Sequence, residues 1–293
     1  MRTKNWLFLL TALAAQPALA QSAAPQLQLV EQRLAATVSE NPGEYGIAAM
    51  DLTTGETVSF NGDRAFPMAS TVKVAVAATY LSEVDAGRRS LTDTVGAMTA
   101  EQQMNLMLTR SDNHATDMLF AALGGPATVD AWLHTQGVGG IRVDRNIARL
   151  LADRRDLKDP RDSSTPKAML QLLRQIDTGS ALKPQSRLVL LDMMRRCVTG
   201  RNRIKALLPA GTPVEHKTGT LSGFTGDVAF VTLPDGRRVA MAMFGRGGDN
   251  RAGLIATAAR AIYDGFNTVP ATATASTAPQ QGGYGAMFGS QGR

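Results

Sequence analysis

A serine and a lysine three residues apart, Ser70 and Lys73, open an Ala-rich apolar stretch that runs to Leu81. On a helix, positions i and i+3 lie on the same face, so the hydroxyl and the amine would point the same way. Burial and the positive end of the helix dipole both lower the pKa of a lysine at the start of a helix. A neutral amine beside a serine hydroxyl is a general base beside a nucleophile, so the pair is a candidate for covalent catalysis.

The Ser-x-x-Lys spacing is a weak signal when it stands alone, because average composition produces it about once in a chain of this length. The chain contains it at Ser70/Lys73, Ser164/Lys167 and Ser180/Lys183. Pro166 interrupts the second copy, and the third falls in a predicted loop. On this evidence, Ser70 and Lys73 are equally consistent with a helix-capping serine and a surface lysine.

Two more polar motifs follow in the chain, Ser111-Asp112-Asn113 and Lys217-Thr218-Gly219. By composition, all three motifs occur in this order in roughly one chain in a thousand. The ordered set therefore favours a catalytic role, and it requires a fold that brings distant segments together.

Strands at both ends of the chain and helices in the middle must position these motifs. The hydrophobic patterns predict strands at 45–52, 56–60, 214–220, 226–233 and 238–244, and helices at 27–41, 70–81, 99–109, 115–136, 166–175, 185–198 and 251–266. Residues 139–162 lack periodicity and are expected to form a long functional loop.

The order of these elements predicts an α/β fold, a five-stranded antiparallel sheet flanked by the terminal helices with an inserted all-helical subdomain. We expect residues 24–60 plus 205–268 to form the α/β subdomain and residues 61–204 to form the helical one. Ser70 would then lie at the junction, where ligands commonly bind.

The two ends of the chain are predicted to lie outside this core. Residues 1–20 have the charged start, short apolar run and Ala18-Leu19-Ala20 site of a signal peptide. The apolar run is too short to span a membrane, so the protein is expected to be periplasmic or secreted. Residues 270–293 are of low complexity and are expected to form a disordered tail.

Composition limits the partners and cofactors. The single cysteine, Cys197, falls within the predicted helix 185–198 and cannot form an internal disulfide. The three histidines show no metal-ligand spacing, so no metal or other cofactor is expected. The net charge is +6, but acidic residues interleave with the basic ones, so no nucleic-acid partner is expected. We expect a monomer.

The three motifs resemble those of the penicillin-recognising serine hydrolases, a group that includes class A β-lactamases and penicillin-binding proteins. The resemblance covers residues 27–267. Additional segments are similar to class A β-lactamases in particular, at 66–70, 161–166, 199–205 and 208–213.

This resemblance implies specific roles at the matching positions. Ser70 would attack the lactam carbonyl, Lys73 would take or relay its proton, and Ser111 would pass a proton toward the departing nitrogen. The N–H groups of Ser70 and Thr220 would form the oxyanion hole. The β-lactam substrate would be bound by Asn113, Arg203, Lys217, Thr218, Gly219 and Thr220.

The loop between Arg145 and Asp162 departs from the family pattern. Arg145 and Asp162 themselves agree with the family pattern, in which this pair forms a salt bridge that closes the neck of the loop. The family places a glutamate inside the loop to activate the water that releases the acyl group. Counting from Arg145 puts Ile147 at that place, whereas counting back from Asp162 puts Arg149 there, with Asp153 at the place of the family's water-holding asparagine. On either count the glutamate is missing, since none occurs between Glu101 and Glu215. The segment between Ser70 and Ser111 is also short for the family, which implies a more open cleft.

Three functions remain compatible with these residues. The first is a β-lactamase, slow in deacylation, in which Lys73 or a loop carboxylate, Asp153 or Asp156, replaces the missing base. The second is a D,D-peptidase or penicillin-binding-like hydrolase, which the open cleft favours. The third is a covalent penicillin binder that is acylated without turnover, since loss of a general base reduces rates by roughly 10²–10⁴.

Overall fold

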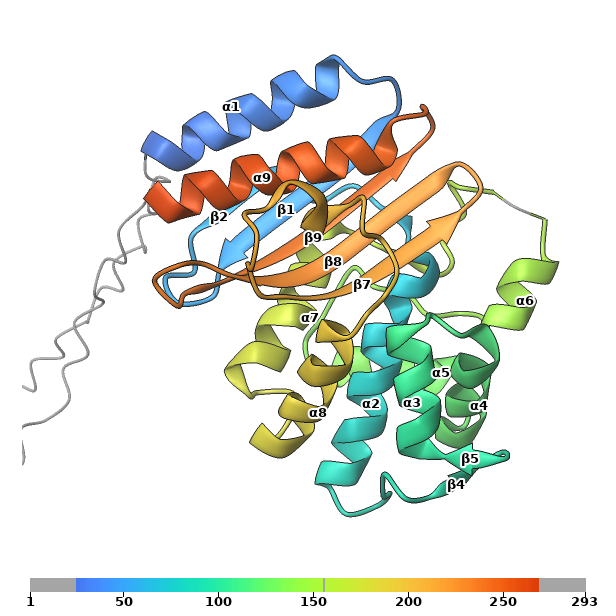
Figure 1. Ribbon diagram of the computed structural model, residues 1–293. Helices are drawn as coiled ribbons and strands as arrows, with labels where there is room; N and C mark the ends of the chain where they lie inside the picture. Colours follow the sequence, from blue (N-terminus) through green and yellow to red (C-terminus); the bar gives the residue numbers. More distant parts are fainter. Residues whose placement is uncertain (1–24, 155, 269–293) are drawn as a thin grey trace, which may run out of the picture.

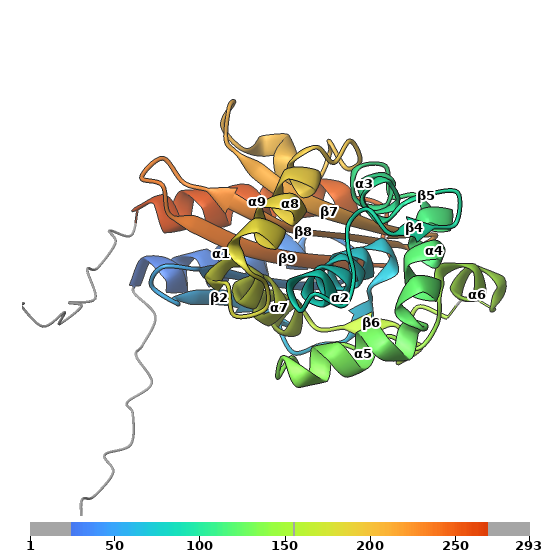
Figure 2. The same ribbon diagram turned by 90° about the horizontal axis from the view of Figure 1, so that it is seen from below.

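The computed structural model describes residues 25–154 and 156–268. The predicted signal peptide and C-terminal tail lie outside the described residues. Figures 1 and 2 show a central sheet with α1 (Pro25–Ser39) and α9 (Arg251–Thr268) on one face and the remaining long helices on the other. Within residues 25–154 and 156–268, no helix is long and apolar enough to cross a membrane.

The central sheet has five antiparallel strands, which confirms the predicted fold class. In spatial order they are β2 (Thr57–Phe60), β1 (Glu44–Asp51), β9 (Arg238–Arg246), β8 (Phe224–Thr232) and β7 (Val214–Leu221). The N-terminal hairpin joins the C-terminal strands through β1 and β9, where Ala48 lies opposite Ala242. This order leaves β7 at an edge of the sheet, beside the segment that contains Ser70.

Both faces of the sheet are buried, each in its own apolar core. One core joins the sheet to α1 and α9 and includes Leu34, Met241 and Ile262. The other joins the opposite face to the inserted helices and includes Phe230 and Phe244. Because the helices and the sheet share this second core, the helical part is stabilised by the sheet as well as by its own packing. The proposed boundaries of the two subdomains stay a prediction.

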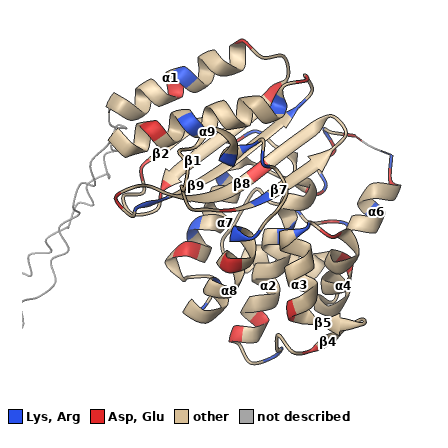
Figure 3. Cartoon of the chain, viewed as in Figure 1, with Lys and Arg blue, Asp and Glu red and all other residues tan. Residues whose placement is uncertain are grey.

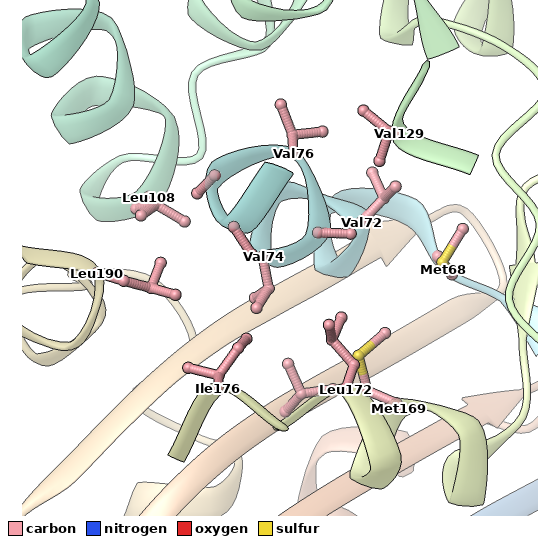
Figure 4. Close-up of a cluster of buried hydrophobic side chains, with 14 of the residues drawn as sticks. Met68, Val72, Val74, Val76, Leu108, Val129, Met169, Leu172, Ile176 and Leu190 are labelled. Carbon is pink, nitrogen blue, oxygen red and sulfur yellow. The ribbon is translucent and has the colours of Figure 1, made fainter. Parts of the chain in front are cut away.

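The helix α2 (Lys73–Asp85) lies in the middle of the second core. Its first nine residues, Lys73 to Leu81, are all buried. Figure 4 shows its valines among side chains from the surrounding helices. Those helices are α3 (Ala100–Thr109), α4 (Asn113–Leu123), α5 (Pro126–Thr135), α7 (Pro166–Thr178) and α8 (Pro184–Arg195). Each fully buried apolar side chain contributes about 1.5–3 kcal/mol, so α2 is a rigid support for its first turn.

Local sequence signals explain where several helices begin. Thr99 and Gln102 form a capping box at the start of α3, in which the side chain of each residue bonds to a backbone N–H of the other. Asp112 accepts a hydrogen bond from the N–H of Ala115 at 2.7 Å and so caps α4. The helical stretch predicted at 115–136 is divided into α4 and α5, because Gly124 takes a left-handed conformation that ends α4.

The structure also corrects the sequence prediction in the long loop and in the helix that was expected to contain Cys197. The expected loop at 139–162 contains a short helix, α6 (Ile147–Ala152), which Asn146 caps. A helix of six residues is too short to produce a recognisable periodic pattern in the sequence. The helix predicted at 185–198 ends at Arg195, so Cys197 lies in the turn after it.

Several short elements complete the fold. They are β3 (Phe66–Pro67), β4 (Thr94–Val95), β5 (Met98–Thr99), β6 (Ser163–Ser164) and the 3₁₀ turns η1 (Ala69–Val72) and η2 (Ile204–Leu207). β3 pairs with β6, which ties the segment before Ser70 to the end of the long loop. Figure 3 shows acidic and basic residues interspersed over both layers; the absence of a nucleic-acid partner stays a prediction.

Candidate active site

Ser70 and Lys73 lie where β3 passes into α2. Residues 69–72 form the 3₁₀ turn η1 rather than the first turn of an α-helix, and Ala69 has a positive φ of 47°. The turn is held by Met68, whose N–H donates to Asp162 and whose carbonyl accepts from Thr71. A strained residue of this kind persists only when its surroundings fix it, so the position of Ser70 is imposed by the fold.

The amine of Lys73 is buried and directed at the start of α4. Its Nζ donates to Asn113 Oδ1 at 2.8 Å and to the carbonyl of Ser111 at 2.7 Å, and it lies 3.3 Å from Ser111 Oγ. Burial, followed by the charge of Lys217, lowers the pKa of Lys73 to about 7, although Asp112 and Asp117 act in the opposite direction. A substantial fraction of Lys73 is therefore neutral near pH 7 and able to accept a proton.

The hydroxyl of Ser111 connects two amines. Ser111 Oγ lies 3.3 Å from the Nζ of Lys73 and 2.9 Å from the Nζ of Lys217. Ser111 has a positive φ of 59°, which turns the chain so that the following residue, Asp112, can cap α4. The three groups form a continuous hydrogen-bonded path along which a proton can move.

Lys217 is the second buried amine of the cleft. Its side chain is fully buried, and its Nζ also donates to the carbonyl of Thr218 at 2.7 Å. Burial is the main reason that the pKa of Lys217 is lowered to about 8. The structure places this amine beside Ser111, and its predicted role in binding the substrate stays a prediction.

Gly219 allows β7 to approach η1. A Cβ atom at this position would lie 2.6 Å from the carbonyl oxygen of Met68 and 3.3 Å from the Cβ of Ala69. Any side chain would therefore push the strand away from the nucleophile. The close approach brings Thr220, the next residue, toward Ser70, which supports the predicted pairing of their N–H groups in the oxyanion hole.

Arg203 binds the same end of β7. Its guanidinium donates to the carbonyl of Gly219 at 3.0 Å and to Thr220 Oγ1 at 2.7 Å. Thr218 Oγ1 lies 2.6 Å from Thr199 Oγ1, a contact that the sequence did not indicate. The structure thus brings together Arg203, Thr218 and Thr220, the groups predicted to bind the substrate carboxylate.

The neck of the long loop is closed as predicted. Arg145 Nε donates to Asp162 Oδ2 at 2.6 Å, and both residues are buried. The same guanidinium donates to Asp153 at 2.8 Å and reaches Asp159 at 3.2 Å. Its hydrogen bond to Asp153 holds the pKa of that carboxyl below its usual range. Asp153, the predicted alternative base, therefore belongs to the salt-bridge network of the loop.

Ile147 occupies the first turn of α6 and is buried. The N–H groups of Ile147 and Ala148 donate to the two carboxylate oxygens of Asp117, at 2.7 and 2.9 Å. The charge of Asp117 also raises the pKa of Lys73. Sequence reasoning missed Asp117, although it stands four residues after Asn113 and so on the same face of α4.

A pocket opens beside Ala69, immediately before the nucleophile. Pro67, Leu150, Asp156 and Leu221 are among the residues that line it. The pocket therefore lies between the nucleophile turn, the long loop and the end of β7. Asp153 is outside this lining, whereas Asp156 is part of it.

No group of three or more His, Cys, Asp and Glu side chains placed to hold a metal ion occurs in the part of the chain that the structure describes. The residues around Ser70 supply a hydroxyl, two amines with lowered pKa values and the guanidinium of Arg203 at the end of β7. This chemistry suits acyl transfer to serine, in which the transition-state charge is stabilised by backbone N–H groups.

The fold and the arrangement around Ser70 define a serine hydrolase of the penicillin-recognising class. The family model described as the β-lactamase enzyme family matches residues 29–266, and the chain therefore belongs to this family. These findings confirm the family that the sequence motifs indicated.

Relatives and solved structures agree with this family. The β-lactamase CTX-M-8 of Citrobacter amalonaticus is 32% identical over 262 residues, which cover 81% of this chain and 89% of the relative. The carbapenem-hydrolysing β-lactamase KPC of Klebsiella oxytoca is 31% identical, with coverages of 84% and 92%. The structure of an ancestral class A β-lactamase superimposes with a TM-score of 0.76 at 33% identity, covering 80% of this chain and 99% of that structure.

Proposed function

We propose that the protein is a serine β-lactamase that opens the lactam ring through an acyl-enzyme on Ser70 and releases the acyl group without a loop glutamate. The observation that carries this proposal is the buried amine of Lys73, whose pKa is lowered to about 7 and which lies within 3.3 Å of Ser111 Oγ. The fold and the family support β-lactam hydrolysis, and the missing glutamate concerns only how fast the second step proceeds.

The first half of the proposed reaction forms the acyl-enzyme. Lys73 accepts the proton of Ser70 as the hydroxyl attacks the lactam carbonyl, and the N–H groups of Ser70 and Thr220 stabilise the oxyanion. Ser111, which is hydrogen-bonded to Lys217, gives a proton to the departing nitrogen. Lys217 and Arg203 attract the substrate carboxylate, and Asn113 orients the substrate amide.

The second half requires a base for the attacking water. Lys73 is neutral again once its proton has passed through Ser111, so the same amine is available for deacylation. Asp153 is the alternative, but its carboxylate is engaged by Arg145, and Asp156 instead lines the pocket beside Ala69. We therefore favour Lys73 as the general base of both acylation and deacylation. Turnover should be slow, because no second base is available to activate the water that releases the acyl group.

Two other functions are also compatible with these residues. A D,D-peptidase-like hydrolase is favoured by the short connection between α2 and α3, which carries only the two-residue strands β4 and β5. A covalent binder without turnover is favoured by the absence of a glutamate from the loop, where a count from Arg145 puts the buried apolar side chain of Ile147 at the place of the family's base. Export to the periplasm or outside and a monomeric state are part of the same proposal.

The test mixes the purified protein with a chromogenic cephalosporin and follows both colour and intact mass. Steady colour supports the β-lactamase, whereas a one-equivalent burst with a lasting adduct supports the covalent binder. Activity on a D-Ala-D-Ala peptide, with neither colour nor adduct, supports the peptidase. A Ser70→Ala variant must form no adduct; an adduct that survives in this variant overturns the assignment of Ser70.

A further inference from the structure

Arg246, the last residue of β9, lies where the sheet meets the long loop. Its Nη1 donates to the carbonyl of Leu157, in the loop, at 2.9 Å. Its Nε and Nη2 donate to Glu44 Oε2, on β1, at 3.1 and 2.7 Å. One guanidinium therefore joins the loop to the sheet, at a second point besides the neck that Arg145 and Asp162 close.

Aromatic rings hold this guanidinium in place. Its central carbon lies 5.2 Å from the centre of the ring of Phe66, a buried residue that precedes the nucleophile turn, which is within the range of a cation–π contact. Phe244 shares one face of β9 with Arg246, because side chains two residues apart on a strand point the same way, and its ring lies 6.1 Å from that of Phe66. The side chain of Arg246 is only 11% exposed, so its hydrogen bonds are largely shielded from water.

Glu44 is the anionic partner in this arrangement. The hydrogen bond from Arg246, more than any other interaction, holds the pKa of Glu44 below its usual range, so the carboxylate is ionised at neutral pH. Arg64 also pairs with Glu44, and Lys158 of the loop lies 3.9 Å from it. Lys158 is 72% exposed, and such an exposed pair contributes little. The link between Glu44 and the loop therefore depends mainly on Arg246.

The loop segment that Arg246 binds belongs to a wall of the pocket beside the nucleophile. Asp156, the residue before Leu157, lines this pocket together with Ala69 and Leu221. The peptide units are planar and linked, so a shift of the Leu157 carbonyl also displaces the neighbouring residue. A group of the substrate that enters this pocket therefore meets a wall whose position is set from β9.

The turn between β7 and β8 contacts the same part of the loop. A Cβ atom on Gly223, in this turn, would lie 2.9 Å from Leu157 Cδ1, so the loop and the turn are closely packed. The carbonyl of Gly223 accepts a hydrogen bond at 2.9 Å from the N–H of Gly247, the residue after Arg246. The end of β9 therefore fixes both sides of the contact between the long loop and the end of β7.

We propose that Arg246 is a positioning residue that holds the long loop against the sheet and so shapes the pocket that receives the acyl side chain of the substrate. The inference rests on the proposed function, in which a β-lactam acylates Ser70. Without the guanidinium, the segment at Leu157 can move away from the turn, and a long acyl side chain loses contacts with one wall of the pocket. A substrate whose side chain is too short to reach this wall keeps its rate.

The test measures the second-order rate of acylation of the purified protein by intact mass, with benzylpenicillin and with 6-acetamidopenicillanic acid. The two probes share the lactam, the carboxylate and the amide, and they differ by a phenyl group. Arg246→Met is the test variant, and Arg246→Lys keeps a charge beside Glu44 without the planar fork that spans Glu44 and Leu157. Arg64→Met is the control, because Arg64 also pairs with Glu44 but forms no hydrogen bond or ion pair with the described residues of the long loop.

We expect the rate with benzylpenicillin to fall roughly tenfold to a hundredfold in Arg246→Met, since a misplacement of about 1 Å can cost that much. The rate with the acetamido probe should stay nearly unchanged. Arg246→Lys should show the same selective loss to a smaller extent, and Arg64→Met should show none.

An equal loss with both probes in Arg246→Met assigns the residue to general stability and overturns the positioning role. If Arg246→Met does not fold, an unchanged ratio of the two rates in Arg246→Lys overturns it. A natural protein that neither probe acylates overturns the proposed function, and the inference with it.

Discussion

The carboxylate of Asp117 accepts a hydrogen bond at 2.7 Å from the backbone N–H of Ile147, the residue that a count from Arg145 puts at the place of the family's loop glutamate. The same carboxylate raises the pKa of Lys73. A negative charge is therefore kept near Lys73, but it comes from α4 and not from the long loop. Because both carboxylate oxygens accept hydrogen bonds from α6, Asp117 acts by holding the loop and by its charge, and not as a base.

Replacing Asp117 with Asn should affect both the loop and Lys73. The variant removes the negative charge, so the pKa of Lys73 should fall further and the rising limb of the pH profile for acylation should move to lower pH. It also removes one of the two oxygens that accept hydrogen bonds from the N–H groups of Ile147 and Ala148, which should lower the free energy of unfolding by about 1–2 kcal/mol. Stopped-flow acylation across pH and urea unfolding measure the two effects.

The matched control is Asp130→Asn. Asp130 also ties its helix to the following segment, through the N–H of Val143 at 2.9 Å, but its charge is not among those that shift the pKa of Lys73. The control should lose stability without moving the pH profile. An equal movement in both variants would show that loosening of the loop, and not the charge of Asp117, changes Lys73.

The rate of acylation should pass through a narrow maximum between pH 7 and 8. Below about 7, Lys73 is protonated and cannot accept the proton of Ser70, so the rate rises with pH. Above about 8, Lys217 loses the charge that attracts the substrate carboxylate, so kcat/KM falls again. Steady-state rates with a chromogenic cephalosporin in buffers of constant ionic strength give both limbs.

A Lys217→Arg variant separates the two limbs. Arginine keeps its charge at every accessible pH, so the falling limb should move to higher pH while the rising limb remains with Lys73. If the falling limb stays in place, a group other than Lys217 is responsible for it.

The sequence predicted those parts of the protein that depend on regular patterns and on short motifs. The five strands follow from local hydrophobic patterns and turn residues, and the structure contains all of them. The approach of Ser111 to Lys73 and Lys217 also agrees with the motifs, because the fold brings their elements together.

The parts that the sequence did not reveal are interactions between elements. The carboxylate of Asp117 meets α6 thirty residues later, and no local pattern specifies that contact. The contact of Cys197 with Thr199 depends on where α8 ends, and helix ends are the least certain part of a pattern-based prediction. The short helix α6 begins at Asn146, whose side chain caps it, but its six residues are too few for a periodic signal.

The buried Arg145 should be essential for the stability of the long loop. Arg145→Met leaves Asp162 buried without its partner, and breaking a buried ion pair in this way lowers the free energy of unfolding by about 3–5 kcal/mol. Arg161→Met is the matched control, because Arg161 pairs with Asp159 in the same loop but is about half exposed, and such pairs contribute less than about 1 kcal/mol. Equal losses in urea unfolding would contradict the assigned role of Arg145.

Placing a glutamate at Ile147 should test directly whether the loop limits turnover. The N–H of Ile147 is held by Asp117, so the new side chain would start from a fixed backbone position at the beginning of α6. If Lys73 is the only deacylation base in the natural chain, Ile147→Glu should speed acyl release by roughly 10²-fold, the usual contribution of a positioned base, and leave acylation nearly unchanged. Ile147→Gln is the control, because it has nearly the same shape and also buries a polar group but cannot take a proton. Release of the acyl group is followed by intact mass after a single turnover, and equal rates in the two variants would show that position 147 does not face the acyl-enzyme.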